Sequence, residues 1–196
     1  ALGGIASFEA LTAGFSLKYY GLSGGTKDPF KNEKITKIKT QGISLGVQNQ
    51  SYFRVKRFGI DETIEASTVD LHLIALKVKY DLNHRFYIAG EASFAYEGRS
   101  GGYAHGIFGF GIKSNKFCND KLSAFLELSA GAAGGGRVDS GEGILVRPTA
   151  GINYHATKDL SFNISGGHMV SPWGNVSSSN INIGLTYGFS LLNAKK

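Results

Sequence analysis

The residues of this sequence that could do chemistry are a few histidines and carboxylates near Gly- and Ser-rich stretches. His105 and His168 lie near the ends of alternating segments, and Asp139 and Glu142 lie in the Gly-rich stretch 134–143. A carboxylate beside an imidazole can activate a water molecule for hydrolysis. No fixed spacing along the chain holds these groups together, so the sequence favours solvated loop charges over a catalytic pair.

The sequence supports neither a nucleotide-binding loop nor a metal site. Arg137, Val138 and Asp139 follow the glycine run 134–136, where a phosphate-binding loop of the Walker type needs a Lys-Ser/Thr pair and a helix. None of the five histidines share a strand at i, i+2 spacing. The single cysteine, Cys118, excludes a multi-cysteine metal site and an intrachain disulfide. The sequence therefore predicts no cofactor and no bound metal.

The elements that would position these residues are segments in which apolar and polar side chains alternate, and the clearest is 180–191. Every second side chain from Ile181 to Leu191 is apolar, whereas Asn, Gly, Thr and Ser occupy the positions between. A tilted strand of about ten residues spans a bilayer. Because the pattern recurs along most of the chain, it predicts a closed antiparallel up-and-down β-barrel in a bacterial outer membrane.

The composition favours the same class. Of the 196 residues, 42% are hydrophobic and 18% are charged, yet no run reaches the ~18 apolar residues of a transmembrane helix. This length predicts a single domain over 1–196, with an N-terminal extension at 1–9 and a C-terminal tail at 192–196. The net charge is +6, but no nucleic-acid-binding motif accompanies it, so we expect no nucleic-acid partner. The start Ala-Leu-Gly-Gly lacks a basic region, and we expect a mature chain whose signal peptide has been removed.

Other alternating segments and their connections suggest an orientation. The segments are 69–80, 86–97, 104–113, 122–128, 146–155 and 160–165. Short polar connections, typical of periplasmic turns, are 81–85, 114–121 and 155–159. Gly- and Ser-rich connections, typical of external loops, are 98–102, 134–143 and 170–179. A change of phase predicts a bulge near Leu73–Ala75, and Pro148 predicts either a bulge or a strand that has emerged above the membrane.

The first third of the chain leaves the number of strands open. Seven alternating segments lie from residue 69 onward, and bacterial outer-membrane barrels have an even number of strands, so an odd number of strands must precede residue 69. Three strands, at about 10–22, 36–48 and 50–59, give ten strands, which is our main prediction. One strand gives eight, and part of 1–66 is then an N-terminal extension or a large external excursion.

Charged and titratable side chains at the alternate positions are expected to face the barrel lumen. They are Asp70, His72, Lys77, Lys79, Glu91, Lys113, Glu127, Arg147 and His155. An unpaired buried charge costs several kcal/mol, so we expect a network that plugs the lumen, with Glu127 paired to Arg147 across adjacent strands. The alternative is a narrow polar pore lined by these charges. Side chains just fill an eight-stranded barrel, and ten strands leave slightly more room.

Two stretches resemble a known family of proteins. The closing segment 184–189 resembles the aromatic-ended last strand that the outer-membrane insertion machinery reads, although seven residues follow it here. The stretch 78–88 resembles a strand–short turn–strand hairpin of the same proteins. Together they are similar to small bacterial outer-membrane barrels of eight to ten strands, the OmpA/OmpX/OmpW-like group.

This resemblance implies a non-enzymatic structural or interaction role through the external loops, with outer-membrane lipid and lipopolysaccharide as surroundings and a protein partner in the envelope or outside the cell. The loop residues that would carry the interaction are Arg137, Asp139, Glu142 and Trp173. One alternative is a narrow conduit for small solutes. A second is a lipid A-modifying enzyme, but lipid A deacylases have a His-x-Ser arrangement, and the nearest match here is 155–157, at a predicted periplasmic turn.

Overall fold

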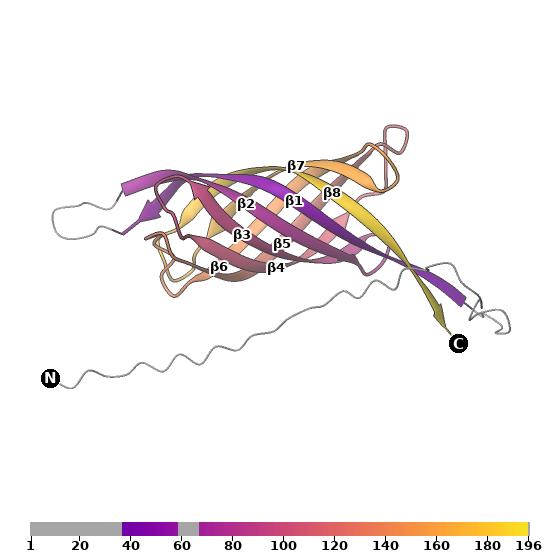
Figure 1. Cartoon of the computed structure of the whole chain (residues 1–196), viewed down its shortest axis with the longest axis horizontal. Helices are drawn as coiled ribbons and strands as arrows, with labels where there is room; N and C mark the ends of the chain where they lie inside the picture. Colours follow the sequence, from indigo (N-terminus) through magenta and orange to yellow (C-terminus); the bar gives the residue numbers. More distant parts are fainter. Residues whose placement is uncertain (1–36, 59–66, 196) are drawn as a thin grey trace, which may run out of the picture. The chain divides into compact units, whose positions relative to one another are not determined.

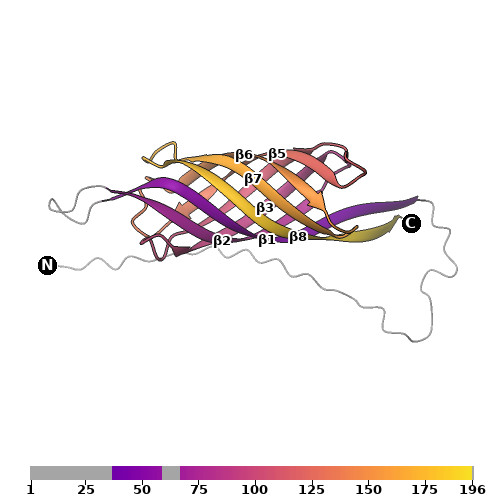
Figure 2. The same ribbon diagram turned by 90° about the horizontal axis from the view of Figure 1, so that it is seen from above.

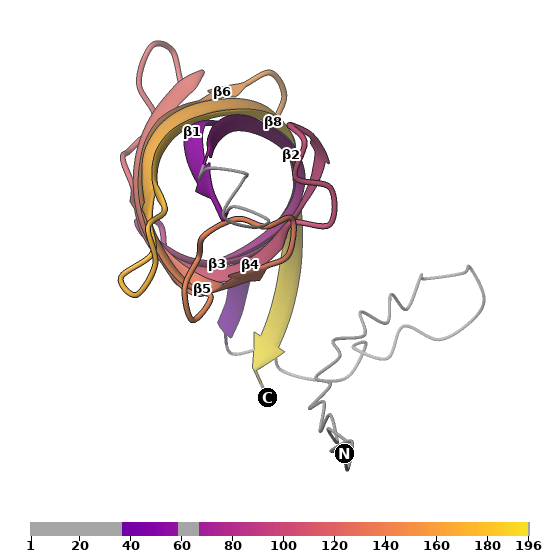
Figure 3. The same cartoon turned by 90° about the vertical axis from the view of Figure 1, so that its left-hand side faces the viewer.

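A computed structural model describes residues 37–58 and 67–195, and these residues form a closed barrel of antiparallel strands (Figure 1). The strands are β1 (Lys37–Arg57), β2 (Ser67–Asp81), β3 (Phe86–Glu97), β4 (Ala104–Lys113), β5 (Leu122–Gly134), β6 (Ile144–His155), β7 (Leu160–Val170) and β8 (Ser177–Lys195). Each strand pairs with the next, and β8 pairs with β1, so the wall closes on itself as the end-on view in Figure 3 shows. The prediction of a closed up-and-down barrel is therefore confirmed.

The main prediction of ten strands is wrong, and the alternative of eight is correct. The segments predicted as two strands, 36–48 and 50–59, are one strand, β1, of 21 residues. The polar residues Gln48 and Gln50 are not in a turn, because their amide groups point inward and donate to Asn163 and Glu91 at 2.9 and 2.7 Å. The third predicted segment, 10–22, lies outside the described residues.

The first residues of β1 and the last residues of β8 pair with each other beyond the points where β1 stops pairing with β2 and β8 stops pairing with β7. The β1–β8 ladder begins at the pair Lys37–Lys195, whereas the β1–β2 ladder begins at Ile43. Figure 2 shows the resulting two-stranded ribbon at one end of the barrel. The predicted C-terminal tail, 192–196, is thus part of β8 as far as Lys195.

Three described connections lie at each end of the barrel. The turn end carries 82–85, 114–121 and 156–159, of four, eight and four residues, and the loop end carries 98–103, 135–143 and 171–176, of six, nine and six residues. At the turn end, the Asn83 side chain accepts from the backbone N–H groups of Arg85 and Phe86, both at 2.8 Å, which fixes the β2–β3 turn. Cys118 is an exposed free thiol in the β4–β5 turn.

The outer side of the wall is apolar. Its mid-wall side chains include Leu76, Phe108, Leu126 and Ile183, which are 58%, 76%, 60% and 61% exposed. Leu and Ile side chains in a continuous band around a barrel are unfavourable in water and favourable in hydrocarbon. The wall is therefore built to face lipid, as in transmembrane barrels.

Within the described residues, no helix has the length and apolarity needed to cross a membrane.

The change of phase predicted near Leu73–Ala75 is absent from β2, because Leu71, Leu73, Ala75 and Lys77 all point inward. The irregularities lie in the neighbouring strands, where β1 gains a residue after Tyr52 opposite Leu71 and β3 gains one beside His72.

Asp70 and His72 consequently lie on the outer side of the wall, contrary to the prediction that they face the lumen. The Asp70 carboxylate accepts from the backbone N–H of Arg54 at 2.8 Å. The Nδ1 atom of His72 lies 2.9 Å from the hydroxyl of Ser51, a neighbour on β1. Both residues therefore belong to a polar rim near the loop end.

Candidate functional site

The centre of the lumen is a buried ion network that joins strands across the barrel. Lys77 Nζ lies 2.5 Å from Glu127 Oε1 and 3.4 Å from Glu91 Oε2. Arg147 Nη2 lies 2.7 Å from Glu91 Oε2. The four side chains come from β2, β3, β5 and β6 and are almost fully buried. They connect opposite sides of the lumen with alternating charge.

The predicted pair of Glu127 with Arg147 is not formed. In the β5–β6 ladder Arg147 lies opposite Ser129, and Thr149 lies opposite Glu127, so the two charges are offset by two residues. The long guanidinium instead reaches across the lumen to Glu91 and to the Tyr52 hydroxyl, which accepts from Nη1 at 2.7 Å. Glu127 pairs with Lys77 from the opposite side.

Neutral groups complete the hydrogen bonding of the two carboxylates. Gln50 donates to Glu91 at 2.7 Å. Tyr87 and Ser129 donate to Glu127 at 3.0 and 2.9 Å. Buried carboxylates are stable only when most of their oxygen lone pairs find donors, so this shell keeps the network ordered.

His105 and His168 do not pair with Asp139 or Glu142 in the described part of the chain, and the sequence analysis had disfavoured such pairs. His105 is buried in the lumen beside the rings of Tyr52 and Tyr103, and its nearest carboxylate is Glu91, with Nε2 3.6 Å from Oε1. His168 points outward from β7, away from the lumen, and contacts the hydroxyls of Ser177 and Ser179. Asp139 and Glu142 lie in the β5–β6 loop.

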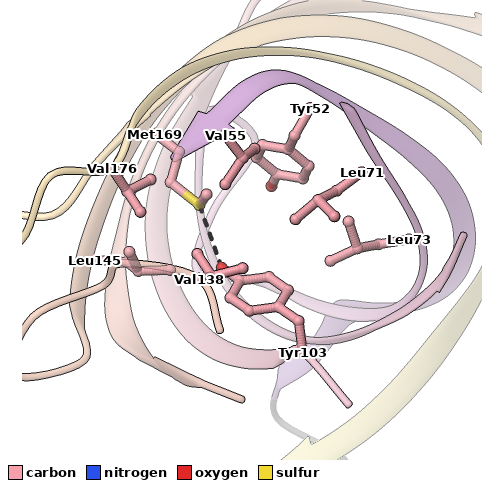
Figure 4. Packing of buried hydrophobic residues seen from close by; sticks show 9 residues of the cluster. All are labelled: Tyr52, Val55, Leu71, Leu73, Tyr103, Val138, Leu145, Met169 and Val176. Atoms are coloured by element: carbon pink, nitrogen blue, oxygen red, sulfur yellow. Dashed lines mark hydrogen bonds between the residues drawn. The ribbon is translucent and has the colours of Figure 1, made fainter. Parts of the chain in front are cut away.

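An apolar cluster closes the lumen on the loop side of the ion network (Figure 4). Its members are Tyr52, Val55, Leu71, Leu73, Tyr103, Val138, Leu145, Met169 and Val176, each at most 4% exposed. Tyr103, Val138 and Val176 come from the loops and point into the barrel mouth. The loops therefore contribute side chains to the barrel core, and we call this set the apolar cap.

The β5–β6 loop lies across the mouth as a lid and is held by backbone hydrogen bonds on two sides. The amide of Phe58 donates to Arg137 at 2.9 Å, and that of Asp139 donates to Lys56 at 3.0 Å. On the other side, the amide of Asn175 donates to the carbonyl of Asp139 at 3.0 Å. These bonds tie three of the barrel's loop-end segments into one unit.

The four loop residues predicted to contact a partner divide into two kinds. Arg137, Glu142 and Trp173 are exposed, and Trp173 has 60% of its surface free. Asp139 is half-buried, and its carboxylate accepts from the Asn175 side chain at 2.7 Å. Asp139 therefore holds the lid, whereas the other three are free to meet a partner.

The turn-end half of the lumen is polar and holds the remaining predicted charges. Lys113 Nζ lies 2.7 Å from Asp81 Oδ2 at the rim. Lys79 lies over the rings of Tyr87 and Phe125, 5.3 and 4.8 Å from their centroids.

His155 completes this half of the lumen and bridges Ser123 and Ser161 at 2.9 and 2.8 Å. Lys77, Lys79, Glu91, Lys113, Glu127, Arg147 and His155 thus occupy inward positions.

The sequence analysis missed the neutral polar groups of the lumen. They include Gln48, Gln50, Asn163, Ser165, Asn180 and Asn182, which hydrogen-bond side chain to side chain. The signal was present, because amides occupy two successive alternate positions in β8, Asn180 and Asn182, and two in the middle of β1, Gln48 and Gln50. Two further lumen residues are absent from the predicted set. Tyr52 was hidden because an aromatic ring on the inner face resembles the lipid-facing row, and His105 had been assigned to the end of its segment.

No protein-family model matches this chain, and no curated protein matches it. Solved structures with similar shape include a de novo designed transmembrane β-barrel, at 10% identity and TM-score 0.49, covering 76% of this chain and 95% of the design. Neisserial surface protein A has 13% identity and TM-score 0.48, covering 78% of this chain and 99% of that protein. Ail of Yersinia pestis, in complex with the heparin analogue sucrose octasulfate, has 16% identity and TM-score 0.42, covering 76% and 98%.

The apolar outer wall and the polar lumen decide the architecture. This chain has the architecture of a small transmembrane β-barrel. In an eight-stranded barrel the lumen is filled by its own side chains. The ion network and the apolar cap fill this barrel in the same way.

Proposed function

We propose that this protein is a non-enzymatic barrel of a bacterial outer membrane that holds a fixed surface at its loop end for a partner. The observation that carries the proposal is the lid, which the barrel ties down and seals with the apolar cap. A surface that is already ordered loses little conformational entropy on binding, which favours affinity.

The loop end has the composition of a binding surface. Trp173 and Phe58 are 60% and 52% exposed, although both are large aromatic side chains. Arg137 and Glu142 lie together on the β5–β6 loop and add charge to this end of the barrel. Aromatic residues and arginine are enriched among the residues that dominate interface energies. In outer-membrane barrels the longer loops face outward, so the partner would be met at the cell surface.

The two alternative functions have less support. A conduit needs a continuous aqueous path, and the cross-lumen bonds of Lys77 and Arg147 oppose one. A lipid A-modifying enzyme needs a nucleophile whose base is oriented by a third group, and in residues 37–58 and 67–195 His168 contacts Ser177 and Ser179 but has no ion pair with a carboxylate.

Photocrosslinking tests the proposed surface directly. A photoreactive amino acid replaces Trp173 in cells that make the protein, and we expect irradiation to give one discrete covalent adduct. The matched control places the same amino acid at Leu82, which is exposed at the turn end. Equal adducts from both positions, or none from position 173, contradict a specific partner at the loop end.

A further inference from the structure

A furrow of about 620 Å³ runs across the lipid-facing side of the wall from β3 to β7. Phe110, Leu126 and Leu128 rise on one side of it, and each is more than half exposed. The floor is low at Ala150 and Gly166, which are direct partners in the β6–β7 ladder.

The residues that line the furrow follow rows of paired residues from Phe86, beside the β2–β3 turn, toward His168, near the loop end. Because the strands of a closed barrel tilt, these rows slope through the membrane. Large side chains stand in the rows on β3 to β5, where Leu126 is the direct partner of Ala150, so the low part of the furrow lies over β6 and β7. An apolar depression of this kind in hydrocarbon can receive part of an acyl chain.

The end of the furrow near the loops is polar. His168 is exposed on the outer wall, and its Nδ1 and Nε2 atoms lie 3.2 and 3.0 Å from the hydroxyls of Ser179 and Ser177 on β8. In either neutral tautomer the imidazole donates to one serine and accepts from the other, so the hydroxyl proton of the first serine is free to donate outward. A hydroxyl donor of this kind beside the imidazole is a hydrogen-bonding partner for a phosphate oxygen.

Pro148 contributes to the same place. It lacks a backbone N–H, and the β6–β7 ladder pairs Val146 with Val170 and Thr149 with Gly167 but skips the position of Pro148 opposite His168. The ladder is interrupted where the apolar furrow meets the polar end. This explains a proline inside a closed wall, where the sequence predicted a bulge or an emerged strand.

We propose that the furrow binds one acyl chain of a phosphorylated glycolipid of the lipid A type, and that His168, Ser177 and Ser179 hold its phosphate. The choice of an outer-leaflet glycolipid rests on the proposed outward orientation of the loop end. The phosphate monoester of such a lipid carries more charge than the diester of a phospholipid, and it is therefore the stronger hydrogen-bond acceptor for the group of His168, Ser177 and Ser179.

Native mass spectrometry of the detergent-solubilised full chain tests the site, with lipid A and phosphatidylglycerol added in turn at equal concentration. We expect about tenfold more barrel with one bound lipid A than with one phosphatidylglycerol, the ratio that one extra charged hydrogen bond supports. His168→Ala removes this preference, and Ala150→Phe, which fills the furrow, lowers the retention of both lipids.

Two variants at outward positions that do not line the furrow serve as controls. His72→Ala removes another outward histidine that contacts a serine, and Ala92→Phe adds a ring at an exposed site outside the furrow. We expect both to retain lipid as the unmodified chain does. Ala150→Leu replaces Ala150→Phe if the latter does not give a folded, heat-modifiable band on gels.

Equal retention of the two lipids by the unmodified chain overturns the proposal, and so does unchanged selectivity in His168→Ala. These outcomes leave the loop-end partner untouched, because photocrosslinking at position 173 reads another surface.

Discussion

An Arg147→Met variant will have a free energy of unfolding about 3–5 kcal/mol lower than the unmodified barrel, measured by urea titration in lipid vesicles. Arg147 is 1% exposed and bonds Glu91 and Tyr52 at 2.7 Å each. Methionine retains much of the apolar length of the side chain but leaves Glu91 with less positive charge inside the wall. The penalty is that of an undercompensated buried carboxylate.

A second ion pair of this barrel provides the matched control. Lys113 pairs with Asp81 at 2.7 Å, but its side chain is 28% exposed at the turn-end rim. Exposed pairs contribute about 0–1 kcal/mol, so Lys113→Met will change stability by no more than that. The double variant Arg147→Met/Glu91→Gln will regain part of the loss, because the unpaired charge is gone. Equal losses in the two single variants would show that the central network is not a buried, low-dielectric unit.

A Leu76→Arg variant will lower the free energy of unfolding in vesicles by about 2–4 kcal/mol, the cost of an arginine on the lipid face near the bilayer midplane. Leu76 lies in the middle of β2 and is 58% exposed on the outer wall. In water the same substitution would cost almost nothing, since the side chain is already exposed. The size of the loss in the free energy of unfolding therefore shows whether the outer wall at Leu76 faces hydrocarbon or water.

Leu82→Arg is the control for this substitution, because Leu82 is exposed in the turn after β2, at the predicted membrane interface. There the same change will cost about 0–1 kcal/mol. If Leu76→Arg and Leu82→Arg cost the same, the outer wall does not face hydrocarbon.

The wall could be predicted from the sequence because alternation is local. In 180–191 every second residue is apolar, and a closed barrel turns that pattern into one lipid-facing row. The same reasoning placed Lys77, Glu91 and Arg147 on the inner face. It failed at Asp70 and His72, because Leu71 and Leu73 belong to the apolar cap inside the barrel, and an apolar row that faces the lumen looks the same in the sequence as one that faces lipid.

The contacts inside the lumen could not be predicted, because they depend on reach across the barrel and not on adjacency along the sheet. Glu127 and Arg147 are on neighbouring strands, yet each finds its partner on the far side. The length of β1 was also hidden, since the polar run around Gln48 reads as a turn until Asn163 and Glu91 supply its partners. The furrow depends on small residues of two strands that meet only after closure.

The central claim is that the ion network and the apolar cap seal the lumen. Its most direct test is single-channel recording in planar bilayers, with insertion of the full chain verified by protease protection. The cross-lumen ion network and the apolar cap predict no discrete conductance steps for the unmodified protein over the usual range of voltage. Reproducible steps of uniform size, carried by the unmodified chain, would contradict the sealed lumen and favour the narrow conduit.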